Sequence, residues 1–186
     1  MDSPEIQRLK EELKLFPYMD TFPVIADSVF IASGAKVIGD VEIGKYSSIW
    51  YNTVVRGDVH YIRIGEKTNV QDLSMLHVTN AKYPLNIGNK VTIGHSVTLH
   101  GCTIEDLCLI GMGAVVLDGA IIKERSMVAA GSVVKQNFVV PSGKLAAGVP
   151  ARIVRDLTSD EIKEFEASAE RYVKYKEITE KSLENL

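Results

Sequence analysis

Large apolar residues recur every six residues through most of this chain, and a spacing so short and regular leaves few folds open. The ladder runs from Ile25 to Val134, with restarts at Ile64, Ile87 and Ile104. Its eighteen members are Ile25, Ile31, Val37, Ile43, Ile49, Val55, Ile64, Val70, Leu76, Ile87, Ile93, Leu99, Ile104, Ile110, Val116, Ile122, Val128 and Val134. Because a six-residue repeat cannot bury its apolar face alone, the pattern predicts an all-β solenoid whose stacked repeats share one core.

A second inward column precedes the first by two residues and is made of small or β-branched side chains. Its members are Ala35, Val41, Ser47, Thr53, Thr68, Ser74, Val91, Val97, Cys102, Cys108, Ala114, Ala120, Ser126 and Ser132. Glycines that follow the large residue predict corners, because glycine tolerates the backbone angles of a tight bend. These glycines are Gly44, Gly65, Gly88, Gly94 and Gly111. If each coil contains three hexads, the eighteen hexads form six coils of a triangular prism. The alternative fold is an antiparallel sandwich, but a sandwich does not require apolar residues at a regular spacing of six.

Length and charge restrict the surroundings of this solenoid. A chain of 186 residues suffices for one well-buried domain with terminal additions. The net charge of −3 offers no basic footprint for nucleic acid or anionic lipid, so we expect neither partner. The acidic start Met1-Asp2-Ser3-Pro4-Glu5 does not resemble a signal peptide, and no apolar run is long enough to span a membrane. We therefore expect a soluble, cytoplasmic protein, with Cys102 and Cys108 as buried core residues.

Both ends of the chain are predicted to be helical. We divide the chain into an amino-terminal helical extension (1–21), the solenoid (22–157) and a carboxy-terminal helix (158–186). Ser3-Pro4 begins a short amphipathic helix, with proline at its first position. Thr158 and Glu161 form a capping box for the second helix, whose apolar stripe is Ile162, Phe165, Ala169 and Val173. Capping the solenoid or packing against another copy is the expected role of both helices.

Three of the four histidines, His77, His95 and His100, fall within 24 residues of the ladder. If residues 78–86 form a corner loop, His77 and His100 lie on one face of the prism, one coil apart, with their rings adjacent on the outside. His95 then lies on another face, so a neighbouring copy must supply it, which predicts a homotrimer with three equivalent metal sites. If residues 78–86 instead contain two further hexads of the repeat, His77 lies directly above His95 on the same face. The six-residue period alone is compatible with both arrangements.

Short motifs around these histidines carry a family resemblance. They are Val55-Arg56-Gly57-Asp58, Asn69-Val70-Gln71-Asp72, His77, Ile93-Gly94-His95 and Leu99-His100-Gly101-Cys102. Together they are similar to the γ-class carbonic anhydrases and γ-carbonic-anhydrase-like proteins, over about residues 22–157. The resemblance implies a left-handed parallel β-helix of hexapeptide repeats and a trimer with metal between its subunits. It also implies that one chain supplies His77 and His100 and that its neighbour supplies His95.

The same resemblance implies an activity, namely metal-dependent reversible hydration of carbon dioxide to bicarbonate through a metal-bound hydroxide at trimer interfaces. Zn²⁺ is the first choice, one ion per subunit interface, and Fe²⁺ or Co²⁺ also suits imidazole ligands. Gln71 resembles the residue that orients the hydroxide or bicarbonate, and Asn69 is expected to assist it.

Four further residues have expected roles in substrate binding or at the interface. Arg56 and Asp58 match the family's interface ion pair, in which a guanidinium holds a carboxylate with two hydrogen bonds. Asp72 is expected to end a strand or to support a ligand, and Tyr172, on the terminal helix, is a candidate for lining the site.

The chain departs from the family pattern where a proton must leave the site. Val59 and residues 79–84 stand where the best-known family member carries glutamates, so proton export needs another route or is slow. His60 is nearby and has a suitable intrinsic pKa, although a surface role is the simpler interpretation.

Two other functions remain open from the sequence. One is a hexapeptide-repeat acyltransferase, a group that shares this fold and the tail Gly148-Val149-Pro150-Ala151. The other is a catalytically silent, metal-binding trimeric scaffold.

Overall fold

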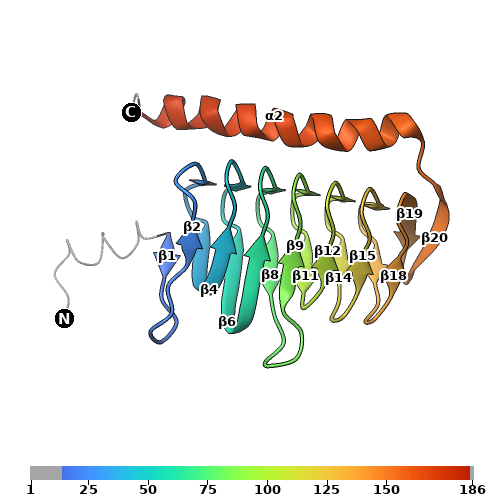
Figure 1. Ribbon diagram of the computed structural model, residues 1–186, viewed down its shortest axis with the longest axis horizontal. Helices are drawn as coiled ribbons and strands as arrows, with labels where there is room; N and C mark the ends of the chain where they lie inside the picture. The colour runs from blue at the N-terminus through green and yellow to red at the C-terminus, as the bar shows by residue number, and fades with distance from the viewer. Residues whose placement is uncertain (1–13, 185–186) are drawn as a thin grey trace.

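Short parallel strands stack coil upon coil into a triangular prism, with one long helix lying along it (Figure 1). The computed structural model of the chain describes residues 14–184. Among these residues, every strand pairing except that of β19 with β20 is parallel. The predicted left-handed β-helix is confirmed. Residues 1–13 of the predicted amino-terminal helical extension (1–21) lie outside the described part of the chain, and its residues Leu15–Phe16 form a strand that pairs with Val37–Ile38 of the solenoid.

The prism has three faces, which we number in the order used below. Face 1 consists of β1 (Leu15–Phe16), the first halves of β4 (Lys36–Ile43) and β6 (Val54–Ile64), β8 (Met75–His77), β11 (Thr98–His100), β14 (Val115–Val116) and β17 (Val133–Val134). Face 2 consists of β2 (Val24–Ile25), the second halves of β4 and β6, β9 (Leu85–Ile87), β12 (Thr103–Ile104), β15 (Ile121–Ile122) and β18 (Val139–Val140). Face 3 consists of β3 (Phe30–Ile31), β5 (Ser48–Ile49), β7 (Asn69–Val70), β10 (Thr92–Ile93), β13 (Leu109–Ile110), β16 (Met127–Val128), β19 (Lys144–Gly148) and β20 (Ala151–Asp156).

The two predicted inward columns form the core. Every large residue of the ladder except Ile25 is buried, and so is every member of the small column. The ladder also continues further than its period predicted, since Val140 and Ala146 are buried and begin a seventh coil. Ile62 and Leu85 occupy the small column at two restarts, where inserted loops break the spacing of six. Cys102 and Cys108 are buried free thiols, as expected, and burial raises the pKa of Cys108 to about 12.

The five corner glycines are not needed for the backbone angles of a bend, which is the role that the sequence predicted for them. None of the five has a positive φ, whereas the left-handed corner positions hold side chains such as Tyr46, Lys67 and Lys90. At Gly111 a Cβ would lie 2.4 Å from the backbone nitrogen of Ala130 in the next coil. These glycines are therefore required because adjacent coils approach closely, and not because the chain bends there.

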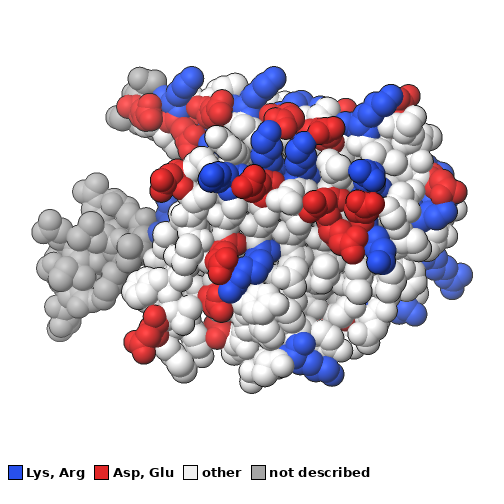
Figure 2. Space-filling view, in the orientation of Figure 1, with Lys and Arg blue, Asp and Glu red and all other residues white. Residues whose placement is uncertain are grey.

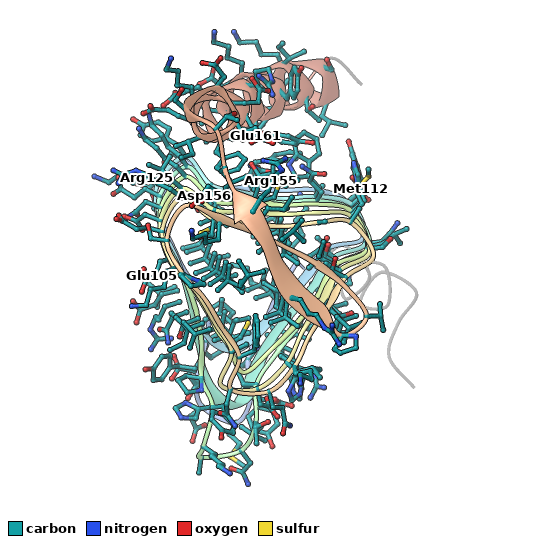
Figure 3. The ribbon with its side chains drawn as sticks, turned by 90° about the vertical axis from the view of Figure 1, so that its right-hand side faces the viewer. Glu105, Met112, Arg125, Arg155, Asp156 and Glu161 are labelled. Atoms are coloured by element: carbon teal, nitrogen blue, oxygen red, sulfur yellow. The ribbon has the colours of Figure 1, made fainter. Side chains whose placement is uncertain are left out.

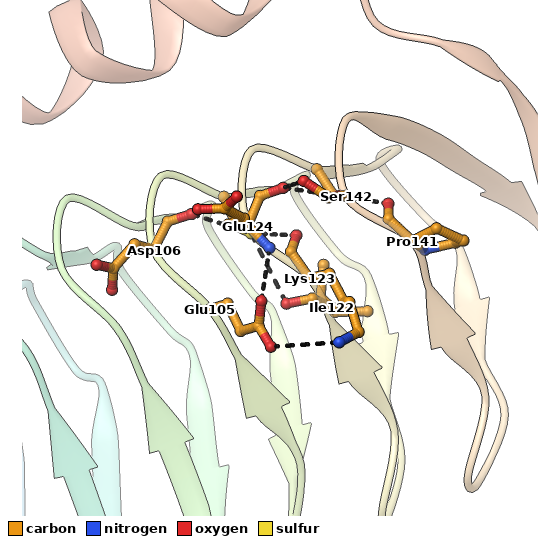
Figure 4. A network of polar contacts seen from close by, with 9 residues as sticks. Glu105, Asp106, Ile122, Lys123, Glu124, Pro141 and Ser142 are labelled. Carbon is orange, nitrogen blue, oxygen red and sulfur yellow. Dashed lines mark hydrogen bonds and ion pairs between the residues drawn. The ribbon is translucent and has the colours of Figure 1, made fainter.

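Polar side chains tie successive coils together at the corner between faces 2 and 3 (Figure 4). Glu105 accepts a hydrogen bond from the backbone N–H of Glu124, and Ser142 donates to the Glu124 carbonyl at 2.8 Å. The Cys108 thiol donates to the carbonyl of Lys123 at 3.1 Å. These bonds satisfy backbone groups that a two-residue strand leaves at its ends.

Helix α2 (Ser159–Leu183) lies against face 3, as the view along the prism axis shows (Figure 3). It begins with the predicted capping box of Thr158 and Glu161. Lys67 and Lys90 at the neighbouring corner pair with glutamates of the helix, so charges of both signs are interspersed along α2 and the corner beneath it (Figure 2). No helix within residues 14–184 is long and apolar enough to cross a membrane.

Candidate metal centre

His77 and His100 form a pair of adjacent rings on face 1. They end β8 and β11, are register partners in adjacent coils, and have ring centroids 5.1 Å apart. Nδ1 of His77 lies 3.1 Å from Nε2 of His100. His95 follows β10 on face 3, so the count that treats residues 78–86 as a loop is correct. The alternative, in which His77 stacks on His95, is wrong.

Carboxylates determine which nitrogen of each ring carries the proton. Nε2 of His77 lies 3.0 Å from Oδ1 of Asp58, and Nδ1 of His100 lies 2.7 Å from Oδ1 of Asp118. An ionised carboxylate can only accept, so each of these ring nitrogens must donate. In the neutral rings the other two nitrogens hold lone pairs. These are the two nitrogens that face each other.

The surroundings of His77 favour its neutral ring. Burial, followed by the charge of nearby Arg56, lowers the pKa of His77 against the opposing effect of Asp58. Burial raises the pKa of Asp58, but hydrogen bonds from His77 and Arg56 outweigh it, and the net pKa is below its usual value. Asp58 is thus an ionised acceptor, held by Arg56 on one side and by the backbone N–H of Val59 at 2.9 Å.

The donor set fits a divalent metal ion of the zinc type. Two nitrogens, each about 2.0–2.1 Å from a tetrahedral zinc, are about 3.3–3.4 Å apart. The separation of 3.1 Å between His77 and His100 is close to that value. Two lone pairs aimed at each other repel unless a proton or a metal ion lies between them, so the two rings could serve as two imidazole ligands of one ion.

His95 has the same arrangement in a different place. Its Nδ1 lies 2.7 Å from Oδ2 of Asp72, its neighbour in the adjacent coil, which leaves Nε2 as the free nitrogen. The side chain is 47% exposed at the corner between faces 3 and 1, where Met112 of the next coil is labelled in Figure 3. Asp72 thus contacts His95, while its expected role in supporting a ligand stays a prediction.

One protomer does not bring the three rings together. His95 and His100 are separated by five residues along face 1, an extended span on the order of 16 Å. Within residues 14–184, no three His, Cys, Asp or Glu side chains are close enough to share a metal ion. The pair and the single histidine therefore lie at opposite edges of face 1, and we call these two places the half-sites of the candidate metal centre.

An aromatic pocket adjoins the His95 half-site. Its volume is about 410 Å³, and Trp50, Tyr172 and Tyr175 line it together with Asp72 and His95. Tyr172 packs edge-to-face on Trp50 with ring centroids 5.7 Å apart, and burial raises the pKa of its phenol. The structure thus brings Tyr172 to the predicted site, next to His95 and away from the His77–His100 pair.

Gln71 and Asn69, the two predicted catalytic residues, lie at the end of β7, next to Asp72 in the sequence. Gln71 follows β7, one coil from Gly94 and directly beside Asp72. Its Nε2 donates to Oδ1 of Asn69 at 3.1 Å, and Asn69 donates to the hydroxyl of Thr92 at 3.0 Å. Both amides are buried, so their orientations are held by the sheet and not by solvent.

His60 is poorly arranged to accept a proton. Its Nδ1 accepts the backbone N–H of Tyr61 at 2.9 Å, so in the neutral ring Nε2 carries the hydrogen. Arg56, which is 38% exposed, contacts Asp58 of the same chain, so this ion pair forms within one protomer.

Sequence reasoning missed Asp118 and its partners Thr79 and Gln136. The signal was available, because His100, Asp118 and Gln136 are spaced by 18 residues, which is three hexads or one full coil. The three therefore occupy one column along the edge of face 1.

Comparisons with known proteins identify the family of this chain. Residues 22–57 and 101–136 match the family described as "Bacterial transferase hexapeptide (six repeats)". A "Probable carbonic anhydrase" of Methanocaldococcus jannaschii is 49% identical, over 84% of this chain and 98% of that protein. "Gamma carbonic anhydrase 1, mitochondrial" of Arabidopsis thaliana is 46% identical over 89% of this chain, which spans only 62% of that relative's length.

A solved structure has the same architecture. It is a putative acetyltransferase from Bacillus cereus, 45% identical, with a TM-score of 0.88 over 91% of this chain and 97% of that one. The match in sequence extends across the solenoid and includes relatives covered almost completely. The chain therefore belongs to the γ-class carbonic anhydrase and γ-carbonic-anhydrase-like family of hexapeptide-repeat proteins.

Proposed function

We propose that this protein catalyses the reversible hydration of carbon dioxide to bicarbonate with a divalent metal ion. The ion would be held in a homotrimer by His77 and His100 of one protomer and by His95 of the next. One observation carries the proposal, which is that carboxylates fix the tautomers of His77 and His100 so that two lone pairs converge 3.1 Å apart. The names of the relatives at 46–49% identity support the same reaction.

Held by His77, His100 and the neighbouring protomer's His95, a divalent metal ion would supply Lewis acidity, the chemistry that makes water nucleophilic at neutral pH. Zinc suits the ligands, as do ferrous iron and cobalt. The protein's contribution would be to hold the three rings in fixed tautomers through Asp58, Asp118 and Asp72, so that binding requires no change of tautomer.

Gln71 has the chemistry to orient the reacting oxygen atoms. Its Nε2 is committed to Asn69, which leaves Oε1 as the acceptor for the hydrogen of a water or of the bicarbonate hydroxyl. Because Gln71 lies beside Asp72 and His95, it would act from the protomer that supplies the single histidine. Tyr172 and Trp50 would exclude water from the same side.

Proton export is the weak step of this mechanism. Neither Val59 nor residues 79–84 offer a carboxylate, and Nδ1 of His60 is occupied by the backbone of Tyr61. We therefore expect hydration to be limited by proton transfer and to accelerate as the concentration of an imidazole buffer rises.

Stopped-flow measurement of carbon dioxide hydration tests the proposal. Protein loaded with zinc, cobalt or, anaerobically, ferrous iron should exceed the buffer rate. His95→Ala should abolish this activity, and the matched control His60→Ala should retain it. A rate no greater than that of buffer with all three metals would rule out the reaction.

An acyltransferase activity is the second candidate, and the putative acetyltransferase of 45% identity favours it. Such an enzyme would bind coenzyme A, which titration calorimetry detects directly. Stoichiometric metal without coenzyme A binding would eliminate this candidate. Metal binding without turnover of either substrate would leave a metal-stabilised scaffold.

A further inference from the structure

Asp118 accepts three side-chain hydrogen bonds beside the histidine pair. Its Oδ1 accepts from Nδ1 of His100 at 2.7 Å and from the hydroxyl of Thr79 at 3.0 Å. Its Oδ2 accepts from Nε2 of Gln136 at 3.4 Å. The side chain is only 15% exposed, so these donors replace most of its water. The three donors come from three different levels of the solenoid, which fixes the carboxylate in space.

The backbone is adapted to this carboxylate. Gly101, directly after His100, has φ +53°, and a Cβ there would lie 2.4 Å from Oδ1 of Asp118. Any other residue at 101 would therefore push the carboxylate away from the ring. Thr79 begins the loop that follows His77, so Asp118 also connects the segments that carry the two rings.

The consequence for His100 follows from donor and acceptor chemistry. Free neutral histidine exchanges between two tautomers, and only the Nδ1–H form leaves Nε2 with a lone pair. The Asp118 carboxylate cannot donate, so it stabilises the Nδ1–H form alone. Nε2 is the atom that faces His77 at 3.1 Å.

We infer that Asp118 is a positioning residue that holds His100 in its metal-binding tautomer and orientation, with Thr79 and Gln136 holding Asp118 in turn. The inference rests on the proposed metal site. Asp58 does the same for His77, but it belongs to the family motif and is held by Arg56, whereas Asp118 lies outside every motif that marked the site.

Two measurements on the 186-residue chain test this role. The first is zinc affinity by chelator competition, where Asp118→Asn and Asp118→Ala should each weaken binding by about 10–100-fold. The second is the ¹⁵N spectrum of the metal-free protein, in which the four histidines can be assigned by single substitutions. His100 should be the Nδ1–H tautomer in the wild type and should lose that preference in both variants.

Asp106→Asn is the matched control. Asp106 accepts from the backbone N–H of Asn89 at 2.7 Å at another corner, so it joins coils as Asp118 does but touches no histidine. It should change neither zinc affinity nor the tautomer of His100. Unchanged affinity and an unchanged tautomer in both Asp118 variants would overturn the inference, even if thermal stability fell. A wild type that binds no zinc would instead overturn the proposed function, and the tautomer measurement would still decide the role of Asp118.

Discussion

Each histidine of the candidate site donates one ring N–H to a carboxylate in a neighbouring coil or strand. The separations between ring nitrogen and carboxylate oxygen are 2.7–3.0 Å, within hydrogen-bond range. The pairs are His77 with Asp58, His95 with Asp72, and His100 with Asp118. One nitrogen per ring is thereby reserved for another partner. A set of surface histidines without a common function has no reason to share this arrangement.

The close approach of Gly101 to Asp118 predicts that a side chain at position 101 will lower both stability and zinc affinity. Gly101→Ala adds a methyl group that collides with Asp118, in addition to the strain of a positive φ. Gly131→Ala is the control, because Gly131 has φ +66° but nothing within 4 Å of the added Cβ. We expect about 1–2 kcal/mol of destabilisation at Gly131 from φ alone, and on the order of 1–3 kcal/mol more at Gly101 from overpacking.

Urea denaturation at one protein concentration measures both variants, and chelator competition measures their zinc affinity. Only Gly101→Ala should lose affinity. Equal effects of the two substitutions on stability and affinity would mean that the contact between Gly101 and Asp118 is unimportant.

The relative positions of the three histidines could be predicted from the sequence. The placement of His77 beside His100, and of His95 on another face, followed from counting hexads once residues 78–86 were taken as a loop. Asp118 was missed because the recognised motifs end at Cys102. Tautomers could not be predicted, since they depend on which side chain of the next coil reaches each ring.

At the scale of elements, strands of two or three residues are stable here because every coil hydrogen-bonds to the next. The long strands β4 and β6 are exceptions, since they continue around the corner from face 1 to face 2. Helix α2 covers face 3 and lines one side of the aromatic pocket. The hydroxyl of Ser168 on the helix lies 3.1 Å from the hydroxyl of Thr92 on face 3. The capping box, predicted from Thr158 and Glu161, sets where this helix begins.

Removing the cap should destabilise the protein without affecting the metal site. Thr158→Ala loses the side-chain acceptor for the backbone N–H of Glu161, at a cost of about 1 kcal/mol. Ser182→Ala, in the last turn of α2, is the control and should be neutral or slightly stabilising, because alanine is the better helix former. Thermal melting and far-ultraviolet circular dichroism measure both. An unchanged melting temperature in Thr158→Ala would show that the cap adds nothing.

At the scale of the whole molecule, the prism keeps the two half-sites at opposite edges of face 1. A stack of close-packed coils cannot bend to bring His95 to His77 and His100 within one chain. Association of copies around a threefold axis would place the single histidine of one protomer against the pair of the next, three times over. Metal binding and trimer formation would then stabilise each other.

A crystal of the zinc-loaded protein, with diffraction collected on both sides of the zinc absorption edge, tests the shared site most directly. We expect three equal anomalous peaks per trimer, each within bonding distance of Nδ1 of His77 and Nε2 of His100 in one protomer. Nε2 of His95 from the adjacent protomer should complete each site. Peaks that lack His95, or rings that remain apart with no peak between protomers, would contradict this expectation.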